Sequence, residues 1–260
     1  MNIKVIILAG GWGTRLGQLG ELVPKPMVNI GNKPILWHIM KIYSHYGFND
    51  FIISAGVKSH IIKNYFMNYD VYSKNFSKDF STGEVIYENL SDKVDWQVSV
   101  VDTGLNTLKG ARIKRLSKYL DEETNMLTYG DGIADINLTE LLDYHNSHGK
   151  TVTISGVHPP ARFGELIEKD GKVISFEEKP QTSVGLINGG FMVFNRKLLD
   201  YLSTDEQCDL EFGTLEKLTE EGEVMVYKHL GNWECVDNER DVIHLSKLWD
   251  NNQAFWKVWD

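Results

Sequence analysis

Cysteine is scarce in this sequence of 260 residues, and long apolar runs and an excess of positive charge are missing from it. Its two cysteines, Cys208 and Cys235, have no Cys-x-x-Cys spacing, which argues against a disulfide framework or a zinc site. No apolar run approaches the roughly 20 residues that a membrane helix needs, so we expect no membrane partner. The short N-terminal apolar run lacks a cationic leader. Together these absences predict a cytoplasmic protein.

The charge balance is negative, with 27 Lys and Arg against 36 Asp and Glu and a net charge of −9 at pH 7. A broad cationic face that could displace counterions is therefore not expected, which excludes DNA and RNA polymers as partners. A single nucleotide is not excluded, because a few local cations suffice to bind it. Hydrophobic residues make up 42% of the chain, which is ordinary for a globular protein and enough for a large core.

Strand and helix patterns alternate over residues 1–150. Strands are expected at Ile3–Leu8, Phe51–Ser54, Trp96–Val101 and Met126–Tyr129, and helices at Pro34–Tyr46, His60–Asn68 and Leu138–His145. This alternation predicts an α/β fold: a doubly wound, Rossmann-like sheet that is mostly parallel and flanked by helices. Ligands of such sheets bind at the carboxyl ends of the strands. We therefore expect residues 1–150 to form a nucleotide-binding half.

Residues 151–260 have a different pattern, with short β-rich pieces between turn residues. These pieces are Thr151–Gly156, Glu165–Glu168, Val173–Glu177, Gly190–Asn195 and Val224–Tyr227. They predict antiparallel additions to a mixed sheet and a small β-rich acceptor or lid subdomain, all within one domain of residues 1–260. The irregular segment from Asp70 to Val94 indicates an insertion or flap. A tryptophan-rich C-terminal helix is typical of a core or of a subunit interface, and the second case would make the protein a homo-oligomer.

A glycine-rich turn follows the first predicted strand and is the most informative feature of the chain. Gly10-Gly11-Trp12-Gly13 can turn its amide N–H groups into one concavity that binds phosphate oxygens. Arg15 adds a forked cation and Lys25 a mobile one. The Walker pattern fails here because no Lys-Ser or Lys-Thr follows, and the dinucleotide pattern fails because Leu16 replaces the third glycine. The turn predicts a polyphosphate site.

This pattern resembles the signature of the sugar-phosphate nucleotidyltransferases, in particular the glucose-1-phosphate cytidylyltransferase branch. Further blocks resemble that branch in the same order along the chain: Gly31–Tyr43, Tyr129–Gly132, Phe176–Pro180 and Ile187–Phe191. The resemblance implies a Mg²⁺-dependent enzyme of capsule or lipopolysaccharide biosynthesis. Its substrates would be CTP and a phosphorylated acceptor, by default α-D-glucose 1-phosphate, and its products a CDP-linked compound and pyrophosphate.

The chemistry of such a reaction agrees with the residue types present. A phosphate monoester has a second pKa near 6, so it is already an anionic nucleophile at neutral pH and requires no general base. The protein must instead align two polyanions and neutralise the charge on the α-phosphate and the leaving group. This requirement explains a sequence with cations and metal-binding carboxylates but no nucleophile–base pair.

The resemblance also implies roles for individual residues. Catalytic residues would be Arg15, Lys25, Asp131 and Lys179, and the Mg²⁺ ligands Asp131 and Asp237. Nucleotide contacts would be Leu8, Gly10, Gly11, Gly13, Thr14, Arg15, Lys25, Ala55, Gly56, Thr103, Arg112 and Thr128, and acceptor contacts Tyr129, Lys179, Asn188, Gly189 and Glu211. Taken alone, Gly130-Asp131-Gly132 is typical of a turn and Asn188-Gly189 of a hairpin.

Three departures from the family pattern leave alternatives open. The first lysine of Lys-Pro-Lys-Pro is missing before Pro24-Lys25-Pro26, and Leu210–Leu215 replaces Trp-Glu-x-Glu-Pro-Leu. The residues before Asp237 differ from Trp-Gln-Pro-Met. Because a site that loses polar partners changes its selectivity, the acceptor could be a non-sugar phosphate such as L-glutamine phosphate. UTP or dTTP could replace CTP, and a non-catalytic nucleotide-sensing subunit is the alternative from another class.

Overall fold

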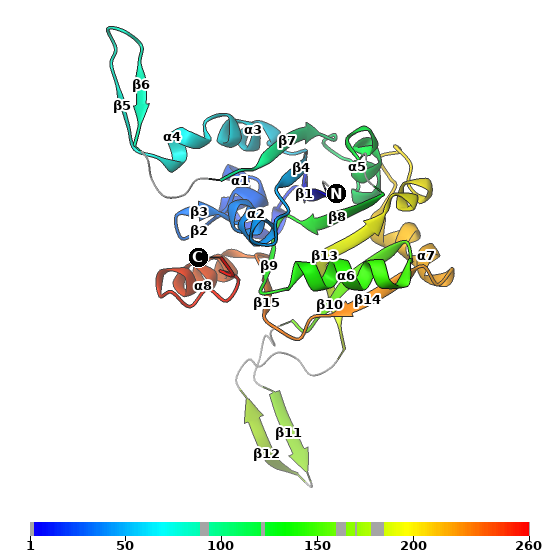
Figure 1. The fold of residues 1–260 in the computed structure, drawn as a ribbon. Coiled ribbons are helices and arrows are strands. Elements are labelled where there is room, and N and C mark those ends of the chain that lie inside the picture. The colour runs from blue at the N-terminus through cyan, green and yellow to red at the C-terminus, as the bar shows by residue number, and fades with distance from the viewer. Residues whose placement is uncertain are drawn as a thin grey trace.

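A seven-stranded sheet forms the centre of the computed structural model, which describes residues 3–88, 94–120, 123–159, 165–169, 171–177 and 185–259 (Figure 1). In spatial order its strands are β14 (Val224–Lys228), β10 (Val152–Val157), β13 (Ile187–Asn195), β8 (Thr124–Tyr129), β1 (Lys4–Ala9), β4 (Asp50–Ala55) and β7 (Gln97–Asp102). Strand β13 runs antiparallel to both neighbours, and every other pair in the sheet is parallel. The predicted mixed, mostly parallel sheet is confirmed.

Eight α-helices are present among the described residues. They are α1 (Gln18–Leu22), α2 (Ile35–His45), α3 (Ser59–Met67), α4 (Tyr69–Ser73), α5 (Lys109–Arg115), α6 (Leu138–His148), α7 (Glu216–Glu220) and α8 (Glu239–Asp250). Of these, α2, α3 and α6 lie where the sequence pattern predicts helices. Short 3₁₀ turns cover Thr14–Leu16, Lys25–Met27, Ser117–Tyr119 and Arg196–Tyr201. Helix α2 begins directly after Pro34, whose fixed φ and missing N–H suit the start of a helix. Among the described residues, no helix is both long and apolar enough to cross a membrane.

Both faces of the sheet are covered by apolar packing. Successive side chains of a strand point to opposite faces, so Val5 and Ile7 of β1 join one cluster while Ile6 and Leu8 join the other. The first cluster includes residues of α2, α3, α6 and α8, and the second includes residues of α5 and α7. Such two-sided burial explains why the strand sequences are almost continuously apolar.

The C-terminal segment belongs to the first cluster. Trp256 is fully buried, and its indole Nε1 donates a hydrogen bond to Nδ1 of His38 at 3.3 Å. The rings of Trp249 and Trp259 lie 4.6 and 6.4 Å from the ring of His38. Of the two expectations for this stripe, core packing is confirmed. The predicted tryptophan-rich helix is shorter than expected, because α8 ends at Asp250 and Trp256 lies in the turns beyond it.

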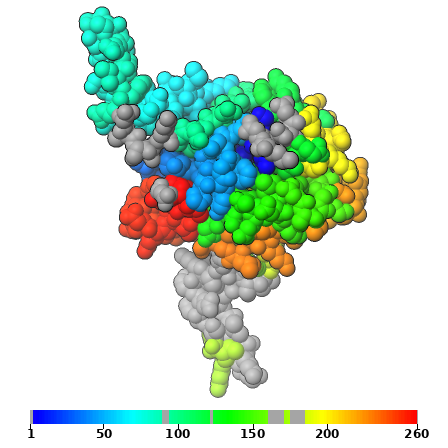
Figure 2. All heavy atoms as spheres, viewed as in Figure 1, coloured from blue at the N-terminus to red at the C-terminus, as the bar shows by residue number. Residues whose placement is uncertain are grey.

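Two hairpins project from the body of the molecule (Figure 1), and the first of them also stands out in Figure 2. The segment from Asp70 to Val94 contains the first, β5 (Phe76–Lys78) with β6 (Val85–Tyr87), and is an insertion relative to the sheet. The second hairpin pairs β11 (Glu165–Lys169) with β12 (Lys172–Glu177). The other predicted β pieces of the second half, β10, β13 and β14, extend the central sheet itself. Both halves of the chain therefore share one sheet.

Candidate active site

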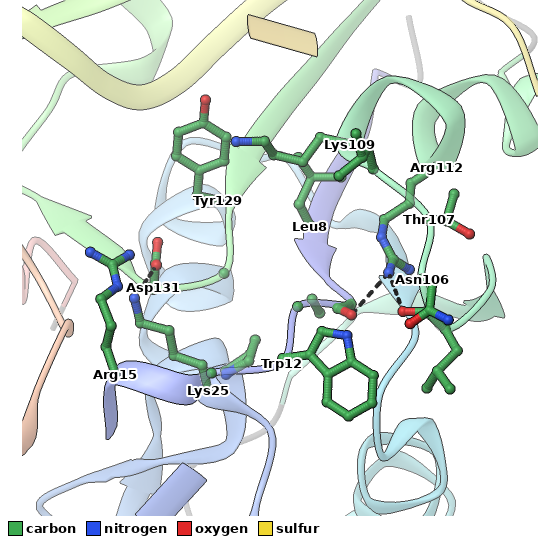
Figure 3. Close-up of a pocket in the computed structure, with 18 residues that line it drawn as sticks. Leu8, Trp12, Arg15, Lys25, Asn106, Thr107, Lys109, Arg112, Tyr129 and Asp131 are labelled. Atoms are coloured by element: carbon green, nitrogen blue, oxygen red, sulfur yellow. Dashed lines mark hydrogen bonds and ion pairs between the residues drawn. The ribbon is translucent and has the colours of Figure 1, made fainter. Parts of the chain in front are cut away.

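The adjacent parallel strands β1 and β8 bring the glycine-rich turn and Asp131 to the same edge of the sheet. Leu8 pairs with Tyr129 in register, and the amide of Gly130 donates to the carbonyl of Leu8 at 3.0 Å. A Cβ on Gly130 would lie 2.7 Å from that carbonyl oxygen, so the close approach requires glycine. The loop after β1 and the loop after β8 therefore line one pocket (Figure 3).

The glycine-rich turn forms part of the lining of this pocket. Gly13 has a φ of 65°, in the left-handed region that favours glycine, and immediately precedes the 3₁₀ turn Thr14–Leu16. That turn carries Arg15, whose side chain is 73% exposed. The glycine-rich turn and Arg15 both line the pocket. Their binding of phosphates stays a prediction.

Four charged residues from distant parts of the chain meet beside this turn. Nζ of Lys25 lies 2.6 Å from Oδ2 of Asp131 and 2.7 Å from Oδ1 of Asp237, so one ammonium bridges two carboxylates. The guanidinium of Arg15 lies 3.0 Å from the other oxygen of Asp237. The structure thus brings together four of the residues predicted for catalysis or metal binding. Lys179, the fifth, lies outside the described residues.

Asp237 is positioned beside Lys25 by a short antiparallel pair of strands that ends just before it. Strand β15 (Trp233–Cys235) pairs with β9 (Gly132–Ala134), and the amide of Val236 then donates to the carbonyl of Asp131 at 2.9 Å. Asn238 caps α8, and Asp241 completes the capping box by accepting from the amides of Asp237 and Asn238. The second carboxylate is therefore held by a strand on one side and a helix start on the other.

The carboxylates determine the protonation states around Lys25. Burial alone would lower the pKa of Lys25, but Asp131 and Asp237 outweigh it and the pKa is raised, so the ammonium stays charged at neutral pH. Burial, together with these carboxylates, raises the pKa of Cys235 to about 12. That thiol stays protonated and is no nucleophile. The cluster provides charge without a covalent catalyst.

The same donor set fits a divalent cation. Asp131 and Asp237 already share one positive charge between them, and Mg²⁺ usually takes only one or two carboxylates from a protein, with phosphates and water as its other ligands. Within the described ranges, no group of three or more His, Cys, Asp and Glu side chains could hold a metal ion. A metal at this site would therefore take its remaining ligands from phosphate oxygens or water.

A second polar cluster surrounds Tyr129, and two of its members, Lys109 and Tyr129, line the pocket. The hydroxyl of Tyr129 donates to Oε1 of Glu211 at 2.5 Å and accepts from Nδ2 of Asn188 at 3.0 Å. Nζ of Lys109 lies 2.6 Å from the same Glu211 oxygen and 5.4 Å from the centre of the Tyr129 ring. Three residues predicted for the acceptor thus come together, and Lys109 joins them without having been predicted. We call Lys109, Tyr129, Asn188 and Glu211 the acceptor wall.

A family model described as nucleotidyl transferase matches residues 4–254. This chain belongs to the nucleotidyl transferase family. Two glucose-1-phosphate cytidylyltransferases, from Salmonella typhimurium and Salmonella typhi, are each 43% identical to it over 260 residues, covering 99% of this chain and 100% of theirs. The crystal structure of HddC from Yersinia pseudotuberculosis has a TM-score of 0.67 and 24% identity, covering 95% of this chain and 99% of that one. Its similarity shows the same fold.

The nucleotide contacts predicted for this nucleotidyl transferase fall into two groups. Leu8, Gly10, Gly11, Gly13, Arg15, Lys25 and Arg112 line the pocket, whereas Thr14, Ala55, Gly56, Thr103 and Thr128 are not among its lining residues. Thr103 and Thr128 are buried in the body of the fold. Their predicted roles stay predictions, and any contribution of the buried pair to binding would act through the lining residues.

Arg112 was predicted to contact the nucleotide, but its hydrogen bonds in the structure go to protein oxygens around the pocket. Its guanidinium is buried and donates to the carbonyls of Ala55 and Gly104 and to Oγ1 of Thr103. It also donates to the carbonyls of Gly10 and Leu105, the two bonds drawn in Figure 3. These acceptors follow or end β1, β4 and β7. A Cβ on Gly10 would collide with the guanidinium. Arg112 therefore fixes the glycine-rich turn of this nucleotidyl transferase from behind.

Several lining residues were missed by sequence reasoning. Trp12, Leu105, Asn106, Thr107 and Lys109 all line the pocket. Trp12 could have been recognised in the sequence, because a large aromatic residue within a glycine-rich turn does not pack in the hydrophobic core. It is 54% exposed in the structure. The others lie in and after the loop that follows β7, where no residue pattern distinguishes a pocket from an ordinary surface loop.

Proposed function

We propose that this protein is a Mg²⁺-dependent cytidylyltransferase that converts CTP and α-D-glucose 1-phosphate into CDP-glucose and pyrophosphate. One observation carries the proposal: Lys25 bridges Asp131 and Asp237 beside a glycine-rich turn, in a chain 43% identical over its length to glucose-1-phosphate cytidylyltransferases. A sensor of nucleotides would need the turn, but it would not need two carboxylates aimed at the same point.

The reaction we propose is an in-line displacement at the α-phosphorus of CTP. A phosphate oxygen of the acceptor forms a new bond to that phosphorus, and the bond from the phosphorus to the bridging oxygen breaks. The electron pair of the broken bond leaves with pyrophosphate. The amides of the glycine-rich turn and Arg15 would hold the β- and γ-phosphates, while Lys25 would neutralise charge at the α-phosphate. Positioning and charge account for the catalysis, and no side chain has to take up a proton.

Members of this family generally use a divalent metal, and we propose Mg²⁺ here. Asp131 and Asp237 would hold it, because they are the carboxylates that already share a cation in the pocket. When bound, the ion supplies positive charge next to the phosphates. Arg15 and Lys25 would then turn from the carboxylates towards the triphosphate, since both are flexible side chains with several donors.

The acceptor would lie against the acceptor wall and Gly189, and the contact predicted for Lys179 stays a prediction. Burial would raise the pKa of Glu211, but hydrogen bonds from Lys109 and Tyr129 lower it, so Glu211 stays an ionised hydrogen-bond acceptor. Asn188 Oδ1 accepts from the amide of Gly190 at 2.9 Å, which fixes the orientation of its amide group. Ionised and neutral groups with fixed orientations are suited to read the hydroxyls of a hexose.

Pyrophosphate release tests the proposal. The assay would offer CTP, UTP, dTTP and ATP against glucose 1-phosphate, other sugar 1-phosphates and L-glutamine phosphate, with Mg²⁺ or with EDTA. We expect release from CTP with glucose 1-phosphate in Mg²⁺ and none in EDTA. Release only with glutamine phosphate, or only with UTP or dTTP, would replace the substrate in our proposal. No release with any pair, in a protein that still binds CTP, would favour the nucleotide sensor.

Two further proposals come from the sequence expectations alone. We propose a cytoplasmic location, to be tested by cell fractionation, and self-association, to be tested by sedimentation of the purified protein.

A further inference from the structure

Lys109 lies at a position where a lysine does not stabilise its own helix. It is the first residue of α5, and its ammonium is directed into the pocket towards Tyr129 (Figure 3). A cation in the first turn of a helix is disfavoured by the helix dipole, since that end already carries partial positive charge. Because this interaction with the helix dipole is unfavourable, we look for the role of Lys109 in the residues that its side chain contacts.

The contacts of Lys109 are fixed by the backbone on both sides. The amide of Leu108 donates to the carbonyl of Glu206 at 2.8 Å, and the amide of Ala111 donates to that of Cys208 at 3.0 Å. A Cβ on Gly110 would lie 2.8 Å from the carbonyl oxygen of Asp209, so α5 packs directly on the chain before Glu211. The ammonium of Lys109 and the carboxylate of Glu211 are thus held at 2.6 Å by two packed elements.

The ammonium of Lys109 adds a charged hydrogen-bond donor to the acceptor wall. Oε1 of Glu211 already accepts from the hydroxyl of Tyr129 and from Lys109. An ammonium has three donors, and the side chain of Lys109 lines the pocket and is 43% exposed. The wall therefore presents a strong donor, held over an aromatic ring, to any molecule that lies against it.

We propose that Lys109 is a specificity-determining residue for the acceptor, and that its ammonium donates a hydrogen bond to one hydroxyl of a hexose 1-phosphate. Glu211 and the Tyr129 ring hold the ammonium in place for that contact. This inference rests on the proposed function and adds to it the residue that selects one hydroxyl pattern among hexoses.

The test compares Lys109→Met with the wild type against glucose 1-phosphate and its 2-, 3-, 4- and 6-deoxy analogues. Losing a hydrogen bond from a charged donor should raise the KM for glucose 1-phosphate about ten- to a hundredfold. The KM for CTP should stay within about twofold, because the phosphate-binding turn is untouched. On one deoxy analogue the substitution should cause no further loss, and that analogue identifies the hydroxyl. Lys109→Arg, which keeps a charged donor, should restore part of the affinity.

Lys118→Met is the matched control, because Lys118 is also an exposed lysine above a tyrosine ring, that of Tyr119, but does not line the pocket. Its KM values should equal those of the wild type. An unchanged acceptor KM in Lys109→Met, or an equal loss on every analogue, would overturn the assignment of a hydroxyl contact. If the wild type itself releases no pyrophosphate from CTP with any hexose 1-phosphate, the proposed function fails and the inference fails with it.

Discussion

Replacing Lys25 by methionine removes one positive charge from between two carboxylates and changes the length of the side chain little. The ammonium contacts Asp131 at 2.6 Å and Asp237 at 2.7 Å, and the Lys25 side chain is only 14% exposed. In the variant, two partly buried carboxylates face each other while Arg15 still contacts Asp237. We expect a fall in both turnover and stability, for different reasons.

The stability change follows from the two lost contacts. A hydrogen bond to a charged group contributes about 1.5–3 kcal/mol to the free energy of unfolding. The side chains of Asp131 and Asp237 are 28% and 21% exposed, so solvent screening favours the lower end of that range. Two such contacts give a loss of about 3 kcal/mol. For turnover, removing one preorganised cation from the developing charge lowers kcat by about 10²–10³.

The assay measures urea unfolding and pyrophosphate release, each in EDTA and in Mg²⁺. Mg²⁺ should raise the unfolding free energy of Lys25→Met more than that of the wild type, because no ammonium then competes for Asp131 and Asp237. Lys118→Met serves again as the control and should behave as the wild type. A kcat within about threefold of the wild type would refute the role of Lys25, and equal stabilisation by Mg²⁺ would refute the shared cation site.

Three further substitutions test other parts of the structure. Asp131→Asn should lower kcat at least about a hundredfold with little change in the circular dichroism spectrum; near-normal turnover would contradict its role. Arg112→Met leaves buried carbonyls without a donor, so urea unfolding should show a loss of about 3 kcal/mol, and unchanged stability would disprove the support by Arg112. Burial lowers the pKa of His38 to about 4, against about 6.5 for an unfolded histidine. Below pH 6.5 the unfolded chain binds a proton that the folded protein does not, so up to about 3 kcal/mol of the free energy of unfolding is lost as the pH falls from 6.5 towards 4. Urea unfolding at a series of pH values should show a smaller loss over this range for His38→Gln than for the wild type. Equal losses in the two proteins would contradict the role of His38.

The sequence was informative wherever local chemistry repeats a known pattern. The predicted strands and helices of residues 1–150 formed, because apolar periodicity and breakers such as Pro34 and Gly47 act within a few residues. Arg15 and Lys25 could be assigned to the pocket because a glycine-rich turn after a strand has a recognisable sequence, whereas Gly130-Asp131-Gly132 taken alone is typical of a turn. The roles of these residues stay predictions. Asp237 required the family resemblance, since nothing in its own neighbourhood indicates a metal ligand.

What the sequence could not predict depends on contacts between distant segments. The placement of β13 between β8 and β10 is decided by packing of whole strands and by no single residue. Lys109 faces Glu211 only because α5 packs against the chain before Leu210–Leu215. That segment is itself irregular, with a kink of non-helical backbone at Phe212 and Gly213, where Gly213 has a φ of 92°. Arg112, predicted to contact the nucleotide, donates to five protein oxygens whose convergence becomes visible only in three dimensions.

The antiparallel strand β13 has a consequence for how this enzyme could be re-engineered. It joins the two halves edge to edge, with Met192 opposite Leu127 of β8 and opposite Ile154 of β10. An exchange of residues 151–260 with those of a relative would therefore replace one side of a continuous hydrogen-bonded ladder and its packing, and would not swap a detachable module. Changes of acceptor preference are better sought through single side chains of the acceptor wall than through chimeras.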